Sequence, residues 1–276
     1  MSGEFTGAVG VVSERDLLPH GRLARLGAQV VMLAEVDSTN SYLLRRAGEL
    51  PDGTIAWAEL QTAGRGRFKR RWLAPRGTSV LLSILLREAE PTRWSVCAAQ
   101  VAALAACEAI EQTTRCTPAL RWPNDIVLDR RKIGGVLAES HLLTAPGSGA
   151  RRAVVIGIGL NCNQQAEQFE PELREKATSL RIETGQHVDR AALAAGLVSR
   201  LDAYCAQDMA RSDVQAGITR GWTARCRERG SPVRLVHDSV EYSGVITRVR
   251  DDGDLVVRLA DGSERSFGAA TTTRLW

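Results

Sequence analysis

One short stretch of the sequence concentrates positive charge next to a strand that is predicted to be buried. Residues 64–76 read GRGRFKRRWLAPR, with six basic side chains and no acidic one. The glycines Gly64 and Gly66 let the backbone approach a ligand closely and free N–H groups to donate. The guanidinium groups of Arg65 and Arg67 match the oxygens of phosphate and carboxylate groups. The stretch therefore predicts an anion site, although a solvated basic turn fits it equally well when it is read alone.

Two common phosphate-binding patterns do not describe this stretch. The Walker A pattern GxxxxGK[ST] is absent, and the dinucleotide fingerprint lacks its third glycine and the helix that should follow at once. Trp72 adds a flat face that suits a purine or the loop itself. We expect Arg65 and Arg67 to contact a ligand. The other basic residues are expected only to keep the loop in solvent: Lys69, Arg70 and Arg71.

Three further segments place polar or flexible residues near the ends of predicted strands. RWPND (121–125) puts the amide of Asn124 and the carboxylate of Asp125 just after a strand. Lys132 follows beside Gly134-Gly135 and is suited to point inward at an anion, although an exposed hairpin lysine is the commoner case. GIGLN (157–161) ends a strand with flexible backbone and the amide of Asn161, a pattern shared by strands that pass closely under a helix.

The bulk composition narrows the class of protein. The chain has 36 basic and 32 acidic residues in 276, so any anion site must come from local clustering. None of the six cysteines forms a CxxC pair or lies at a metal-ligand spacing from a histidine, so zinc and disulfide frameworks are weakly supported. No secretory signal or membrane-spanning stretch is visible, and a reducing cytoplasm fits this pattern.

The elements that must position these residues alternate between strands and helices. An N-terminal tail is followed by a short helix over 13–27, which Ser13 caps and Pro19-His20-Gly21 breaks. A polar cap at 37–40 starts a further helix. The patterning predicts strands over 28–33, 54–60, 79–86, 120–122, 125–129, 132–139 and 152–160, and long helices over 94–114 and 191–208. Hairpins mixed with helices indicate an α+β class, with a mixed sheet flanked by helices.

The composition changes after about residue 225. Short β-rich runs are predicted over 233–236, 240–249, 255–259 and 264–267, with turns at 237–239, 251–253 and 261–262. The pattern suggests a small barrel. The chain thus divides into an N-terminal tail and short helix (1–27), a main domain (28–225) and a C-terminal β domain (226–276).

The segments together resemble the biotin protein ligase family. The resemblance rests on DSTN (37–40), ELQTAGRGR (59–67), RWPND (121–125), RKIGGVLAE (131–139) and GIGLN (157–161), in this order over residues of about 30–165. It implies the mixed sheet that biotin ligases share with class II aminoacyl-tRNA synthetases, with 28–225 as the catalytic domain and an SH3-like barrel after it. The nearest enzymatic alternative is a lipoate or octanoate ligase, which lacks this GRGR loop and WPND segment.

The family's chemistry implies roles for the residues. The biotin carboxylate attacks the α-phosphate of ATP, and a lysine of a biotin carboxyl carrier domain of a carboxylase then attacks the biotinyl-5′-AMP. Both steps develop negative charge, which preplaced cations stabilise. The resemblance implies biotin contacts by Ser38, Thr39, Asn40, Gln61, Gly64, Arg65, Gly66, Arg67, Lys132 and Gly135. It implies nucleotide contacts by Arg65, Arg67, Trp72, Asn124, Lys132 and Asn161, and catalytic roles for Lys132, Arg67 and Asp125. Mg²⁺ is expected with ATP, with Asp125 as its candidate ligand.

Some features depart from the family or stay open. Many members carry an N-terminal winged-helix domain that represses transcription, but only about 28 residues precede the first predicted strand. We therefore expect no DNA binding and no repressor function; a nucleic-acid module built on the basic stretch is the alternative of another class. Residues 142–152 are expected to be mobile, and their family counterpart orders over the nucleotide. A monomer and a weak homodimer are both compatible with the sequence.

Overall fold

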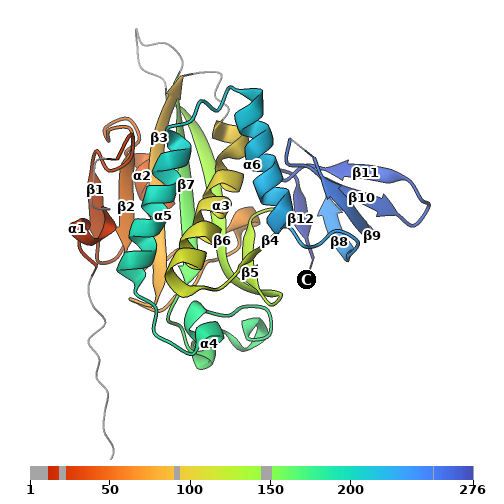
Figure 1. Cartoon of the computed structure of the whole chain (residues 1–276), viewed down its shortest axis with the longest axis horizontal. Coiled ribbons are helices and arrows are strands. Elements are labelled where there is room, and N and C mark those ends of the chain that lie inside the picture. Colours follow the sequence, from red (N-terminus) through yellow and green to blue (C-terminus); the bar gives the residue numbers. More distant parts are fainter. Residues whose placement is uncertain (1–11, 19–22, 90–93, 144–150, 251, 276) are drawn as a thin grey trace, which may run out of the picture.

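The computed structural model describes residues 12–18, 23–89, 94–143, 151–250 and 252–275. Its main unit is a seven-stranded sheet in the order β1-β2-β3-β7-β6-β5-β4 (Figure 1). The strands are β1 (Val30–Leu33), β2 (Thr54–Ala58), β3 (Ser79–Ala89), β4 (Ala119–Arg121), β5 (Asp125–Leu128), β6 (Arg131–Leu143) and β7 (Arg151–Asn161). β1 and β2 pair in parallel and the other neighbours are antiparallel, which confirms the predicted mixed sheet.

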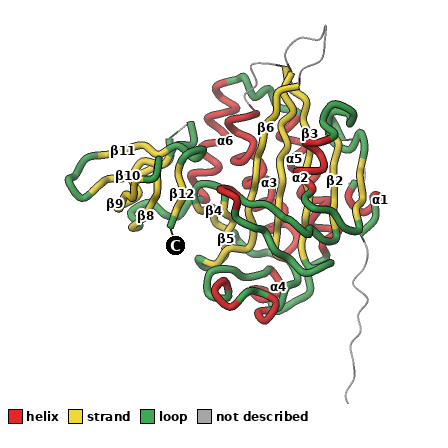
Figure 2. The backbone as a smooth tube through the Cα atoms, turned by 180° about the vertical axis from the view of Figure 1, so that it is seen from behind, coloured by secondary structure: helices red, strands yellow, loops and turns green. Residues whose placement is uncertain are grey.

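The helices divide between the two faces of this sheet. The long helices α3 (Trp94–Thr114), α5 (Arg190–Cys205) and α6 (Ser212–Arg225) form one layer, in which α3 packs on β6 and β7 and α5 packs on β3. The shorter helix α2 (Thr39–Arg45) packs on the opposite side of β3 and β7. Seen from behind in Figure 2, the strands lie in front of the long helices. The short helices α1 (Glu14–Leu17) and α4 (Leu180–Thr184) lie at the periphery.

Side-chain alternation along β3 and β7 separates an apolar face from a polar one. Successive residues of a strand point to opposite faces of the sheet. The even-numbered residues of both strands, such as Leu82 and Ile158, join the large core beneath α3 and α5. On the other face, Ser83 is paired with Gly157 and Leu81 with Gly159. Small and polar residues here leave room above the sheet, next to the first turn of α2.

The first turn of α2 is fixed by its own sequence. Ser38 has an extended backbone and its hydroxyl accepts a hydrogen bond from the N–H of Ser41, the usual geometry of a helix N-cap. Thr39 and Asn40 follow as the first helical residues and are buried although they are polar. Buried polar groups need hydrogen-bond partners. This part of the helix therefore faces a polar site rather than the apolar core.

The C-terminal part forms a separate antiparallel sheet in the order β11-β10-β9-β8-β12. Its strands are β8 (Pro232–His237), β9 (Val240–Val249), β10 (Leu255–Leu259), β11 (Glu264–Phe267) and β12 (Thr272–Arg274). Asp238 and Ser239 both have left-handed φ angles, as the tight hairpin between β8 and β9 requires. Figure 1 shows this sheet beside α6 and β4, at the edge of the main unit.

Most predicted elements are present, with several differences. The sequence did not predict α4, α6 or β12. The segment 142–152 was expected to be mobile, but Leu142 and Leu143 end β6 and Arg151 and Arg152 begin β7; residues 144–150 lie outside the described residues. The expected tail at 1–11 and helix break at 19–22 also lie outside them. Among the described residues, no helix combines the length and apolar character that crossing a bilayer needs.

Candidate functional site

A cavity of about 620 Å³ opens on the polar face of the main sheet. It lies among the first turn of α2, the basic loop after β2, the starts of β5 and β6 and the end of β7. The cavity brings together nearly all the site residues expected from the sequence: Ser38, Thr39, Asn40, Gln61, Arg65, Gly66, Arg67, Trp72, Asn124, Asp125, Lys132, Gly135 and Asn161. Gly64 is the exception, because it is buried behind the loop, against the backbone of Trp72.

The α2 side of the cavity is a network of hydrogen bonds. Oε1 of Gln61 accepts from the backbone N–H of Thr39 at 2.8 Å and from its hydroxyl at 3.1 Å. Ser83 on β3 is fully buried, and its hydroxyl lies 2.6 Å from Oγ1 of Thr39 and 2.7 Å from Oδ1 of Asn40. A side chain oriented by several partners keeps one position. Thr39, Asn40 and Gln61 are therefore fixed before any ligand binds.

The amide of Asn40 lies directly over a glycine of β7. A Cβ atom at Gly157 would lie 2.1 Å from Oδ1 of Asn40, so a larger residue would displace that side chain. Nδ2 of Asn40 donates to the carbonyl of Leu137 at 3.0 Å and to Oε2 of Glu139 at 2.8 Å. Both donor hydrogens are therefore used within the protein, and only the oxygen of this amide keeps capacity for a ligand.

The two arginines expected to contact a ligand are both bound within the protein. Nη2 of Arg65 lies 2.5 Å from Oε2 of Glu139 on β6. Arg67 instead points to the C-terminal sheet, where its guanidinium donates to the backbone carbonyls of Ala269 and Thr272. Burial lowers the pKa of Arg67 to about 10, which still leaves the group cationic at neutral pH. Both charges line the cavity, but neither is free.

The loop that carries these arginines is a tight turn with left-handed backbone at its tip. Phe68 and Lys69 have φ angles of 52° and 60°. Arg70 was expected only to stay in solvent, but its guanidinium reaches the carbonyl of Arg274 at 3.4 Å. The basic loop therefore contacts the C-terminal sheet through two arginines of the loop, Arg67 and Arg70.

Lys132 enters the cavity from the start of β6, as the sequence predicts. Its Nζ atom lies 2.5 Å from Oδ1 of Asp125 and 5.7 Å from the centre of the Trp72 ring. The Trp72 ring lies against Gly159, where a Cβ atom would come within 2.6 Å of the indole. Its Nε1 atom is buried without a hydrogen-bond partner among the described residues. Lys132 thus places a partly exposed ammonium group beside an aromatic wall of the cavity.

The two asparagines expected at the nucleotide have roles in the scaffold. Nδ2 of Asn124 donates to the carbonyl of Val136 at 2.5 Å and thereby joins β5 to β6. Asn161 is buried; its amide donates to the carbonyl of Thr178 and accepts from Gln164. Both residues line the cavity. Their geometry indicates that they shape it, with one of the two hydrogens of each amide engaged in the scaffold.

Several lining or supporting residues were not predicted from the sequence. Ser83 had a usable signal, because Ser79 and Ser83 are the polar members of an otherwise apolar strand and share one face. Glu139 had a similar signal, because it lies four residues after Gly135 and therefore on the same face of the strand. The segment after β7 also lines the cavity, through Phe169, Glu170, Leu173, Lys176 and Ala177.

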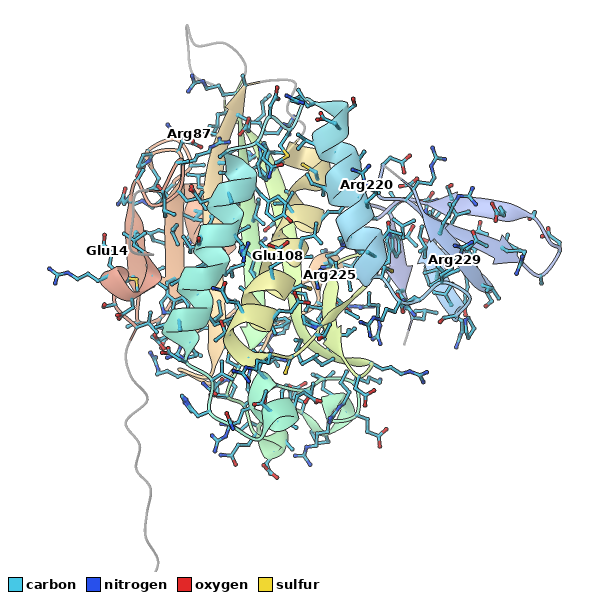
Figure 3. The ribbon with its side chains drawn as sticks, in the orientation of Figure 1. Glu14, Arg87, Glu108, Arg220, Arg225 and Arg229 are labelled. Atoms are coloured by element: carbon cyan, nitrogen blue, oxygen red, sulfur yellow. The ribbon has the colours of Figure 1, made fainter. Side chains whose placement is uncertain are left out.

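A second hollow, of about 480 Å³, lies among α3, α5 and α6 on the other side of the sheet. Figure 3 labels Glu108 and Arg225, which come from α3 and α6. The hydroxyl of Tyr204 donates to Glu108 at 2.9 Å, and Arg225 pairs with Glu111. The charged groups of this hollow are paired with residues around it, whereas the first cavity combines cations with a prepared hydrogen-bonding wall.

Comparison with known proteins gives one consistent family. Residues 32–161 match the model of the Biotin/lipoate A/B protein ligase family. The chain is 34% identical to a biotin–[acetyl-CoA-carboxylase] ligase of Paracoccus denitrificans over 82% of this chain and 93% of that protein. It is 32% identical to the ligase of the same name from Mycobacterium tuberculosis, over 82% of each.

A solved structure agrees with these relatives. The biotin protein ligase from Aquifex aeolicus in complex with biotin and ATP has a TM-score of 0.75 and 25% identity, covering 90% of this chain and all of that one (100%). The part of this chain that matches the family model runs from β1 to the end of β7. It contains most of the residues that line the cavity. On these grounds the chain belongs to the biotin protein ligases.

Proposed function

We propose that this chain is an ATP-dependent biotin protein ligase. It forms biotinyl-5′-AMP from biotin and ATP and then transfers the biotinyl group to a lysine of a biotin carboxyl carrier domain of an acyl-CoA carboxylase. The observation that carries the proposal is the joint placement of Asn40, Arg65 and Lys132 in one cavity. A fixed polar wall suits a small neutral ring, and the cations beside it suit a carboxylate and a phosphate.

In the first step, an oxygen of the biotin carboxylate bonds to the α-phosphorus of ATP as the bond to pyrophosphate breaks. Ser38, Thr39, Asn40 and Gln61 are proposed to hold the ureido ring, which leaves the carboxylate directed at the basic loop. Lys132 is proposed to stabilise the charge that develops on the phosphate oxygens, because its ammonium enters the cavity beside an anion-binding loop. Arg65 and Arg67 are proposed to contact the carboxylate and the α-phosphate, and Trp72, Asn124 and Asn161 to line the nucleotide side.

In the second step, the acceptor lysine amine attacks the acyl carbon of biotinyl-5′-AMP and AMP leaves. The attacking amine must be neutral, and the proton that it loses as the amide bond forms passes to water or to the phosphate of the departing AMP. The carboxylate of Asp125, which lines the cavity, is proposed to orient this amine.

Mg²⁺ is proposed to enter with ATP. This ion is commonly held by one or two carboxylates together with substrate phosphates. No group of three or more acidic, histidine or cysteine side chains forms a metal centre in the described part of the chain. Asp125 fits as a single protein ligand, because its carboxylate lies in the cavity where the phosphates are proposed to bind. The metal would supply further positive charge to the phosphates.

The division into a tail and short helix (1–27), a catalytic domain (28–225) and a C-terminal domain (226–276) is retained as a proposal. The five antiparallel strands of the C-terminal sheet support an SH3-like barrel. A cytoplasmic location also stays a prediction.

The test is incubation with biotin, MgATP and a carrier domain, followed by intact mass measurement of the carrier. A gain of one biotinyl group is expected, and none without ATP. An unmodified carrier would contradict the proposal. Thermal shift with biotin against lipoate distinguishes a lipoate ligase, because the specific ligand stabilises the native state by mass action.

A further inference from the structure

The carboxylate of Glu139 joins two groups that belong to different parts of the cavity wall. Its Oε2 atom accepts from Nδ2 of Asn40, at the start of α2, at 2.8 Å. The same atom lies 2.5 Å from Nη2 of Arg65, in the basic loop. One carboxylate oxygen therefore determines the position of both a residue proposed to bind the ring of biotin and one proposed to bind its carboxylate.

The position of Glu139 in the sheet explains why it acts indirectly. Gly135, Leu137 and Glu139 occupy alternate positions of β6 and therefore share a face. Gly135 and Leu137 line the cavity. Glu139 is paired with Val155 further along the strand, and neither of these two residues lines the cavity. Its contacts with the cavity are made through Asn40 and Arg65.

The bonds of Asn40 show what the carboxylate achieves. One Nδ2 hydrogen is directed to the carbonyl of Leu137 and the other to Glu139, while Oδ1 accepts from Ser83. This arrangement fixes which atom is the oxygen, and that oxygen lies over Gly157, a residue that lines the cavity. The remaining lone pair of that oxygen accepts a hydrogen bond, so the matching ligand group is an N–H donor such as that of a cyclic urea.

We infer that Glu139 is a positioning residue for both ends of biotin in the proposed ligase reaction, and the inference rests on that proposed function. It orients the Asn40 amide as an acceptor for biotin and holds Arg65 at the carboxylate end of the site. The two roles use different properties of the side chain. Asn40 needs a hydrogen-bond acceptor, whereas Arg65 needs a negative charge.

The two substitutions Glu139→Ala and Glu139→Gln separate these roles. Biotin affinity is measured by calorimetry without ATP, and kcat for biotin-dependent pyrophosphate release is measured with both substrates saturating. Glu139→Ala removes the acceptor and should weaken biotin binding by about tenfold or more, the usual cost of losing a hydrogen bond to a charged group. Glu139→Gln keeps a neutral acceptor for Asn40, so biotin affinity should stay within about threefold of wild type, while kcat falls by about tenfold because Arg65 loses its ion pair.

The matched control is Glu264→Ala, which removes an exposed carboxylate paired with Arg248 on the C-terminal sheet. It should match wild type in both measurements, and thermal unfolding of every variant checks that it is folded. A wild type without biotin-dependent pyrophosphate release would overturn the proposed function and this inference with it. An active wild type would overturn the inference alone if Glu139→Ala behaves like Glu264→Ala, or if Glu139→Gln loses biotin affinity as Glu139→Ala does.

Discussion

The Nζ atom of Lys132 lies 2.5 Å from Oδ1 of Asp125, so the ammonium group of the cavity is paired with a carboxylate in the absence of substrate. The side chains are 27% and 13% exposed, and water therefore screens the pair only in part. An incoming phosphate must replace or share this partner. The pair keeps a cation in the cavity and supplies a carboxylate that neutralises its charge.

Lys132→Ala should abolish formation of biotinyl-5′-AMP while the protein stays folded. The proposed stabilisation of the phosphate oxygens is lost, and removal of one such preorganised group typically costs about 100-fold to 1,000-fold in kcat. Pyrophosphate release measures the effect. Lys69→Ala is the control, because this exposed lysine of the basic loop is not among the cavity-lining residues and its loss should leave the rate within about threefold of wild type. Wild-type activity in Lys132→Ala would rule out the proposed role.

Gly157→Ala should impair biotin binding through Asn40. The new methyl group would lie 2.1 Å from Oδ1 of Asn40, so that amide must move out of its network. Overpacking of this kind costs about 1–3 kcal/mol of stability, and biotin affinity should fall by about tenfold or more. Gly48→Ala is the control, since no heavy atom lies within 4 Å of its added Cβ. Equal biotin affinities in the two variants would contradict the proposed contact.

Arg190→Met should destabilise the fold strongly. Arg190 is 4% exposed, and its Nη1 atom lies 2.9 Å from Oε2 of Glu59 at the end of β2. Removing the cation leaves a carboxylate that is only 13% exposed with the neutral indole N–H of Trp57 as its donor, at a cost of about 3 kcal/mol in the free energy of unfolding. Urea denaturation measures the loss. The exposed pair between Arg248 and Glu264 offers the comparison, because Arg248→Met should cost at most about 1 kcal/mol. Similar losses in both variants would mean that burial of the first pair is not decisive.

The buried thiols should make the protein less stable in alkali. Burial raises the pKa of Cys107, Cys162 and Cys205 to about 12, from 9.0 in the unfolded chain. Between pH 9 and 12 the unfolded chain binds fewer protons than the folded one, so the free energy of unfolding falls as pH rises. Each thiol should contribute up to about 1.4 kcal/mol per pH unit in this range.

Cys107→Ala provides the measurement for this pH dependence. The variant is less stable than wild type at pH 8 because a buried side chain is truncated, but the difference should shrink as pH rises above 9. Urea titrations at pH 8, 9, 10 and 11 compare the two proteins. A difference in the free energy of unfolding that stays constant over this range would show that folding does not raise the pKa of the Cys107 thiol.

The sequence predicted the elements whose patterning is local and strong. β3, β7 and α3 have long apolar runs or helical periodicity, and each lies close to its expected range. Helix α6 was missed because Gly217 and Gly221 lower its helix propensity. Tertiary packing compensates, because α6 packs on α3 and buries Ile218 and Trp222.

The cavity residues could be predicted as a set, but not their partners. Motif order indicated which residues gather around the cavity, and the structure places nearly all of them on its wall. The contact of Arg67 with Ala269 and Thr272 had no signal, because the accepting groups are backbone carbonyls about 200 positions away along the chain. The pairing of Arg65 with Glu139 likewise depends on how the loop folds back over β6.

The contact of Arg67 with the C-terminal sheet has a consequence for how this protein can change over evolution. Every residue type supplies the same backbone carbonyl, so side-chain substitutions at positions 269 and 272 leave both acceptors in place. An insertion or deletion in the turn before β12 would move them. The contact therefore constrains the length of the turn between β11 and β12 rather than the identity of the two residues, and a tag inserted in that turn would displace the partners of Arg67.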